Sequence, residues 1–188
     1  NPSLDGSLVA QCWQGESSFP KDSINSRGNW SYLPESLTEA KAVHETMNKA
    51  GFISSIYLKE KGTETSFKQL NGQKKQILHV ATHGFYYNER AWESSRKKSM
   101  GLLLTDTKSV KYVEDKKMTR SGLLMAGCNN VQEGKNANGI DDGILYAYEV
   151  AQLDLSGLDH VSLSACDSGL GEITGEGVFG LQRAFKKA

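Results

Sequence analysis

The sequence predicts an α/β domain in which a largely parallel sheet is layered against helices. Short apolar runs of strand length alternate along the chain with segments that carry helix signals, an order typical of parallel sheets with helical connections. The chain has 188 residues, which suits one domain with a substantial core and falls short of two ordinary domains. We therefore expect residues 1–188 to form a single domain.

Six short apolar runs are the strand candidates. They are LVAQCW (8–13), FISSIYL (52–58), ILHVAT (77–82), MGLLLTD (100–106), SGLLMAG (121–127) and VSLSA (161–165). Runs of this length and character are typical of strands buried on both faces of a parallel sheet.

Four segments between and after these runs carry helix signals. Ser36-Leu-Thr-Glu39 has the pattern of a capping box, and Gly51 is a natural helix stop, so we predict a helix between them. Thr63 is placed to cap a short helix over 64–70. The other two predicted helices are DDGILYAYEVAQLDL (141–155) and GEGVFGLQRAFKKA (175–188), the second with apolar residues at helical spacing.

Composition and charge exclude several functional classes. Lys plus Arg and Asp plus Glu number 22 each, so the formal net charge is zero and gives no electrostatic argument for binding nucleic acid or a membrane surface. No apolar run approaches membrane-spanning length, and the first residues lack the features of a signal peptide. Three cysteines, an odd number, do not indicate a disulfide framework, so we expect a cytoplasmic setting. The chain does not begin with Met, so we expect it to be part of a larger protein.

Two predicted strands end next to side chains that can do chemistry. ILHVAT leads into His83, and VSLSA leads into Cys166. Sites in parallel sheets gather at the carboxyl ends of strands. A cysteine attacks a carbonyl as the thiolate and needs a nearby base, usually a histidine, together with backbone N–H groups for the oxyanion. Gly84 has no side chain to block its N–H group. We therefore expect His83 and Cys166 to meet at one rim of the sheet.

The segments around these residues are long and specific. ILHVATHG, SGLLMAG, DDGILYAYEVAQLDLSG and LSACDSGLGEITGEGVFGLQRAF follow one another in this order. With these segments in this order, the sequence resembles the CHAT family from roughly Leu8 to its end. The family comprises caspase- and separase-like cysteine peptidase domains that are often fused to tetratricopeptide repeats. The resemblance implies a caspase-like three-layer sandwich with a mainly parallel sheet flanked by helices, and endopeptidase activity on protein substrates without a cofactor.

The resemblance also implies roles for individual residues. Cys166 would be the nucleophile and His83 the general base and acid, while the N–H groups of Gly84 and Cys166 would form the oxyanion hole. In this wider peptidase group an acidic pocket residue selects a basic substrate side chain by direct ion pairing. The candidates for that pocket are Asp167, Asp141 and Asp142, although solvated loop carboxylates are the simpler interpretation of each.

The sequence departs from the family pattern in two places. Asp167-Ser168 stands where the family more often has Glu-Thr, a conservative change. The chain ends at Ala188, whereas family members continue with at least one more strand and with loops that line the substrate pocket. We therefore expect the C-terminal strand and loops to be missing from residues 1–188, and the enzyme to be regulated by an attached or separate sensor or tetratricopeptide-repeat module.

Other interpretations of the same residues are weaker. A catalytically idle scaffold or docking domain is the main alternative, and the presence of both His83 and Cys166 argues against it. His79 and His83 form H-x-x-x-H, but on a strand they would lie roughly 13 Å apart, too far to share a metal, so we predict that His79 is a buried structural residue.

Two further features have simple explanations. Residues 175–180 match G-x-G-x-x-G, but the preceding predicted strand ends about ten residues too early for a dinucleotide site. Cys12 and Cys128 are interpreted as packing residues, with an exposed loop thiol as the alternative for Cys128.

Overall fold

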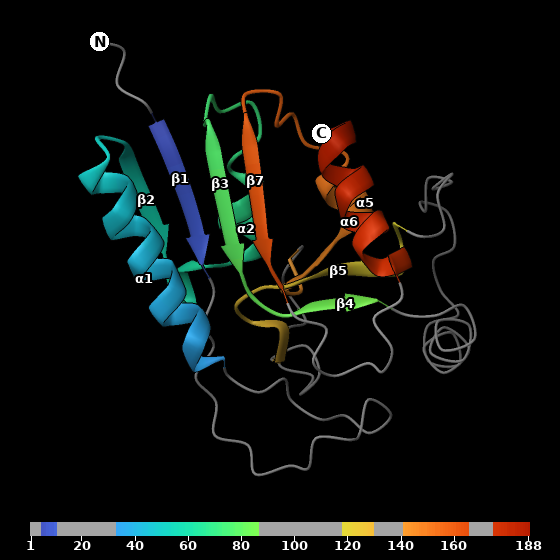
Figure 1. Ribbon diagram of the computed structural model, residues 1–188. Coiled ribbons are helices and arrows are strands. Elements are labelled where there is room, and N and C mark those ends of the chain that lie inside the picture. The colour runs from blue at the N-terminus through green and yellow to red at the C-terminus, as the bar shows by residue number, and fades with distance from the viewer. Residues whose placement is uncertain (1–4, 11–32, 87–117, 130–140, 166–174) are drawn as a thin grey trace, which may run out of the picture.

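The computed structural model describes residues 5–10, 33–86, 118–129, 141–165 and 175–188 (Figure 1). The strands are β1 (Asp5–Ala10), β2 (Ile53–Tyr57), β3 (Ile77–Ala81), β4 (Gly84–Tyr86), β5 (Ser121–Leu124), β6 (Ile144–Tyr146) and β7 (His160–Ser164). The helices are α1 (Pro34–Lys49), α2 (Glu64–Lys68), α5 (Ala147–Val150) and α6 (Gly175–Lys187), with a 3-10 helix η1 (Lys59–Lys61).

Four strands form a parallel sheet in the order β2-β1-β3-β7. The central strand β3 pairs with β1 on one side and with β7 on the other, so that Ala81 lies opposite Ala10 and Ser164. The carboxyl ends of β3 and β7 therefore meet at the same edge of the sheet, as Figure 1 shows. The predicted parallel sheet is confirmed for these four strands.

The remaining strands form a second, antiparallel sheet in the order β4-β5-β6. The largely parallel arrangement therefore does not extend to SGLLMAG, which runs antiparallel to both of its neighbours. Gly122 makes the close pairing possible, because a Cβ atom there would lie 2.5 Å from the carbonyl oxygen of Leu145 and 2.8 Å from the ring of Phe85. Only two residues, Thr82 and His83, separate β3 in the first sheet from β4 in the second.

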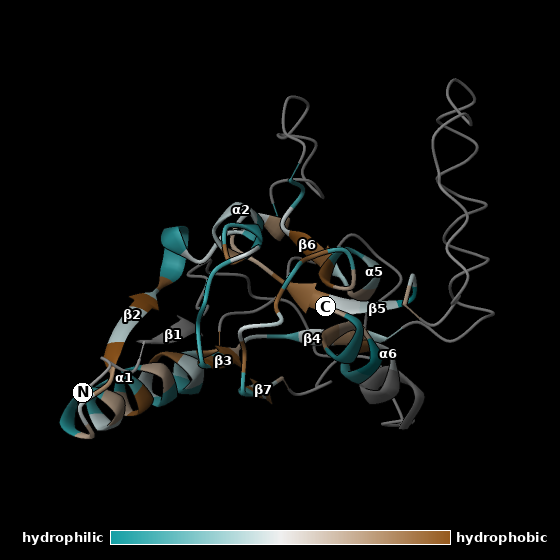
Figure 2. Cartoon of the chain, turned by 90° about the horizontal axis from the view of Figure 1, so that it is seen from above, coloured by the Kyte–Doolittle hydropathy of each residue, from teal (hydrophilic) through white to brown (hydrophobic). Residues whose placement is uncertain are grey.

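The two faces of the parallel sheet are covered differently. Helix α1 contacts β1, β2 and β3 on one side, while α2, α5, α6 and the antiparallel sheet lie on the other (Figure 2). The main apolar core fills the second side and includes Phe67, Leu78, Val80, Leu123, Met125, Leu145, Val150 and Leu181. The mixed α/β class is confirmed, and the full three-layer sandwich stays a prediction. In the described ranges, none of the helices has the length and apolar character needed to cross a bilayer.

The predicted capping box at the start of α1 is wrong. The cap position is Leu33, three residues before Ser36, and the helix begins at Pro34, whose fixed φ suits the first helical position. Ser36 therefore lies inside the first turn, where its hydroxyl donates to the carbonyl of Leu33 at 2.8 Å. The predicted cap of α2 is confirmed, because the Thr63 hydroxyl accepts the N–H of Ser66 at 3.1 Å.

The predicted helix over 141–155 is also wrong outside residues 147–150. Residues 144–146 form β6, only Ala147–Val150 form the helix α5, and residues 151–155 are not helical. Tertiary pairing with β5 decides the conformation of this apolar segment against its local helix signal. The last helix is confirmed as α6, and residues 175–180 form its first turns, which is not the strand-to-helix turn of a dinucleotide site. The run 100–106 lies outside the described residues.

Candidate active site

The backbone around His83 is held by strands from both sheets. The N–H of Thr82 donates to the carbonyl of Ser164 in β7 at 3.2 Å, which extends the parallel pairing past the end of β3. The buried Thr82 hydroxyl donates to the carbonyl of Leu124 in β5 at 2.6 Å. The N–H of Leu124 donates in turn to the carbonyl of His83 at 2.9 Å. His83 therefore lies at the junction of the two sheets, where its main chain is fixed from both sides.

The residue after His83 comes very close to the end of β7. A Cβ atom placed on Gly84 would lie 3.2 Å from the Cβ atom of Ala165, so a glycine permits the tight approach of the two chains. Ala165 is the last described residue of this segment, and Cys166 follows it directly in the sequence. Cys166 and Asp167 themselves lie outside the described residues.

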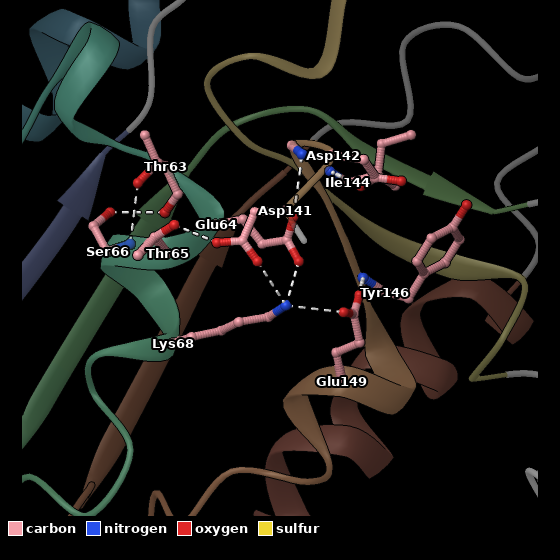
Figure 3. A network of polar contacts seen from close by, with 11 residues as sticks. Thr63, Glu64, Thr65, Ser66, Lys68, Asp141, Asp142, Ile144, Tyr146 and Glu149 are labelled. Atoms are coloured by element: carbon pink, nitrogen blue, oxygen red, sulfur yellow. Dashed lines mark hydrogen bonds and ion pairs between the residues drawn. The ribbon is translucent and has the colours of Figure 1, made fainter. Parts of the chain in front are cut away.

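A cluster of charged side chains lies beside the antiparallel sheet (Figure 3). The Lys68 ammonium contacts three carboxylates, those of Glu64 at 2.5 Å, Glu149 at 3.0 Å and Asp141 at 3.1 Å. These residues, here called the lysine cluster, come from α2, from α5 and from the segment before β6. This cation thus joins α2 to two acidic residues that lie 73 and 81 positions further along the sequence.

Two of the three acidic residues predicted near the substrate, Asp141 and Asp142, are engaged within the chain. Asp141 accepts hydrogen bonds from the Thr65 hydroxyl through one oxygen and from Lys68 through the other, and the bond from Thr65 is the main cause that lowers its pKa. One oxygen of Asp142 accepts the N–H of Ile144 at 2.8 Å, and burial raises the pKa of this carboxyl.

Glu64 is the buried member of the lysine cluster. Its side chain is 2% exposed, with one oxygen on Lys68 and the other accepting the N–H of Gly143 at 3.1 Å. Burial raises the pKa of Glu64 to about 7, against the hydrogen bond from Lys68, which lowers it. Burial alone would lower the pKa of Lys68, but the hydrogen bonds to the carboxylates outweigh it and raise that pKa. The sequence analysis missed this cluster, although Glu64 and Lys68 have the i, i+4 spacing of a helical ion pair.

A second group of polar side chains, the histidine cluster, lies under α1 and consists of Glu39, His79 and Ser164. The Ser164 hydroxyl donates to one carboxylate oxygen of Glu39 at 2.9 Å. The Nε2 atom of His79 lies 3.0 Å from the other oxygen, within ion-pair distance but outside hydrogen-bond geometry. Because the carboxylate lies between the serine and the histidine, this is not the order that activates a serine nucleophile. His79 is 6% exposed, so its predicted burial is confirmed.

The described cysteine outside the predicted site is a packing residue. Cys128 is 4% exposed and lies against Phe85 and Leu124, and burial raises the pKa of its thiol to about 11. Such a thiol is protonated at neutral pH and inert, which confirms the first of the two interpretations of Cys128. In the parts of the chain that the structure describes, no three His, Cys, Asp or Glu side chains are grouped to hold a metal ion.

A model of one protein family matches nearly the whole sequence. The family is described as the CHAT domain, and the match spans residues 3–188. The chain therefore belongs to the CHAT domain family, whose members generally have a caspase-like peptidase fold. Searches among curated proteins and among solved structures returned no match.

Proposed function

We propose that this CHAT-domain protein is a cysteine endopeptidase in which Cys166 is the nucleophile and His83 is the general base. The observation that carries the proposal is the close approach of Gly84 to Ala165. His83 directly precedes the first of these residues, and Cys166 directly follows the second. Because neighbouring Cα atoms along a chain are about 3.8 Å apart, this approach supports a catalytic pair drawn from the ends of β3 and β7.

In the proposed reaction His83 takes the proton from the thiol of Cys166, and the thiolate attacks the carbonyl carbon of the scissile peptide bond. The carbonyl oxygen becomes an oxyanion, which accepts hydrogen bonds from the N–H groups of Gly84 and Cys166. The C–N bond then breaks, and His83 gives its proton to the leaving amine. A water molecule, deprotonated by His83, hydrolyses the thioester and restores the thiol.

An acidic residue near this pair would favour substrates with a basic side chain before the scissile bond. Both oxygens of Asp141 are engaged by Thr65 and Lys68, so its carboxylate has little capacity left for a substrate. We therefore favour Asp142 or Asp167 as the residue that contacts the substrate.

The cellular setting is part of the same proposal. We propose a cytoplasmic peptidase with one or a few protein substrates, controlled by an attached or partner sensor module such as a tetratricopeptide-repeat domain. A role in a defence response, through cleavage of a signalling or pore-forming protein, fits this arrangement by analogy with the family.

The test uses the full-length parent protein with a proteome-derived peptide library and a peptidyl electrophile. We expect cleavage with a consistent residue before the cut and labelling of Cys166, and the loss of both in Cys166→Ala. His83→Ala should lose cleavage by a factor of at least about 100. Cys12→Ser is the matched control for a thiol that has no role. If the electrophile leaves Cys166 unlabelled even with candidate activators present, the catalytically idle scaffold becomes the better interpretation.

A further inference from the structure

Glu64 is a buried carboxylate outside the catalytic pair, and it contacts the backbone of another element. Its two oxygens are divided between the Lys68 side chain and the main-chain N–H of Gly143. Burial of a carboxylate is costly, and an apolar side chain of similar size would fill the space at lower cost. What the carboxylate provides is an acceptor aimed at one specific backbone group.

That backbone group is connected to His83 by consecutive hydrogen bonds. The carbonyl of Gly143 accepts the N–H of Met125 at 2.7 Å. The next residue back, Leu124, donates its N–H to the carbonyl of His83 at 2.9 Å and accepts the hydroxyl of Thr82 at 2.6 Å. Glu64, Gly143, the end of β5 and the main chain of His83 thus form one continuous path.

The middle of this path has little freedom to adjust. Gly143 has a φ of +77°, and a Cβ atom there would lie 2.4 Å from the backbone nitrogen of Cys128. The segment is therefore packed against the turn that follows β5, and a shift of Gly143 would have to move that turn. The N–H of Ala126 in the same turn donates to the carbonyl of Gly62, just before α2, which ties the turn to the helix that carries Glu64.

We propose that Glu64 is a positioning residue for His83, holding Gly143 and, through it, the end of β5 that fixes the histidine backbone. The proposal rests on the proposed catalytic role of His83 and extends it to a residue on α2. Lys68 supports the same arrangement, because it holds the second oxygen of Glu64 and anchors the segment before β6 through Asp141.

The first experiment measures hydrogen exchange of single backbone amides in the full chain. Glu64→Asp keeps the charge but shortens the side chain, so that it cannot reach both Lys68 and Gly143. We expect the amide of Leu124 to exchange about tenfold faster than in the unmodified protein, relative to the amide of Val80 in β3. Glu64→Gln keeps a carbonyl acceptor for Gly143 and should restore the protection of Leu124 to within about threefold.

Leu155→Ala is the matched control for a simple loss of stability. Leu155 is 5% exposed and belongs to the core, outside the path to His83. Its truncation should accelerate exchange at Leu124 and Val80 by the same factor, because both then exchange through global opening. Equal acceleration of the two amides in Glu64→Asp as well would overturn the proposal.

The second experiment measures the rate at which iodoacetamide modifies Cys166 across pH, with the site identified by mass spectrometry. A cysteine paired with a histidine reacts at a lower pH than a free thiol. We expect the rate at pH 6.5 to fall about tenfold in Glu64→Asp, to recover in Glu64→Gln and to be unaffected in Leu155→Ala.

The two measurements separate failure of this proposal from failure of the proposed function. In Glu64→Asp, faster amide exchange at Leu124 with an unchanged rate of Cys166 modification would show that His83 does not depend on Glu64. That result would refute the positioning role of Glu64 and leave the proposed peptidase function standing. If Cys166 in the unmodified protein reacts at pH 6.5 no faster than a free thiol such as glutathione, the proposed function fails, and the exchange at Leu124 still decides whether Glu64 holds the backbone of His83.

Discussion

The lysine cluster and the histidine cluster flank the parallel sheet on opposite sides and are built differently. In the lysine cluster the buried Glu64 holds a backbone N–H group, and Glu149 does the same for Tyr146 at 2.9 Å. In the histidine cluster Glu39, whose side chain is 37% exposed, lies against the side chains of His79 and Ser164. The lysine cluster fixes main-chain groups around one buried carboxylate, while the histidine cluster joins side chains beneath α1.

The comparison indicates where the fold tolerates change. A buried group that satisfies backbone N–H groups leaves those groups unpaired when it is removed, and this costs more than the loss of a partly exposed side-chain contact. We therefore expect substitutions on the side of the lysine cluster to destabilise the protein more than matched substitutions on the side of α1.

The largest difference should come from two glycines that share a left-handed backbone. Gly143 beside the lysine cluster has a φ of +77° and a Cβ atom there would meet the backbone of Cys128, whereas Gly51 after α1 has a φ of +89° and open space around it. We expect Gly143→Ala to lower the free energy of unfolding by about 3–5 kcal/mol and Gly51→Ala by about 1 kcal/mol. Urea denaturation of both variants measures this, and equal losses would refute the difference between the two sides.

Removal of the central cation should have the next largest effect. Lys68→Met leaves three carboxylates around one apolar side chain, and the expected loss of stability is about 2–3 kcal/mol, because Lys68 is partly exposed and Glu64 can take up a proton. Lys61→Met on the exposed η1 is the control and should change stability by less than about 0.5 kcal/mol. Thermal or urea unfolding of the Lys68→Met and Lys61→Met variants measures this. A loss of stability in Lys68→Met no larger than in Lys61→Met would show that the lysine cluster is not stabilising.

Glu64→Gln should change how stability depends on pH. The pKa of Glu64 is raised from about 4.5 to about 7 in the folded chain, so the folded state binds the proton more tightly than the unfolded state. The protonation of Glu64 therefore contributes to the stability of the folded protein. This contribution is complete below pH 4.5 and is lost as the pH rises through 7. The stability of the unmodified protein relative to Glu64→Gln should therefore fall between these values, by at most about 1.4 kcal/mol per pH unit. Urea titrations at pH 5, 6, 7 and 8 measure it, and parallel curves would contradict the shift.

The smallest effect is expected in the histidine cluster. Glu39→Gln removes the charge beside His79 but keeps an acceptor for the Ser164 hydroxyl, and we expect a loss below about 1 kcal/mol. The same denaturation assay applies at pH 7. A loss as large as that of Lys68→Met would show that exposure is a poor guide to the importance of the two clusters.

The sequence alone was sufficient to predict most of the elements and part of the site. Apolar runs placed β2, β3 and β7, and apolar residues at helical spacing placed α6, because a buried strand or helix face needs apolar residues at its own period. His83 and Gly84 were predicted just after a strand, and the structure places His83 two residues beyond β3 and Gly84 at the start of β4. The pairing of His83 with Cys166 stays a prediction, supported by the approach of Gly84 to Ala165.

Only the tertiary structure decided the features that depend on partners distant in sequence. Residues 144–146 carry a helix signal, but they pair with β5 and form a strand, since burial in a sheet outweighs a weak local preference. Asp141 was a candidate for the substrate pocket by analogy with acidic pocket residues of the wider peptidase group, yet its carboxylate binds Lys68, 73 positions away in the chain. Local patterns determine which segments can form strands and helices. Which charged groups meet, and at what exposure, depends on packing that brings distant segments together.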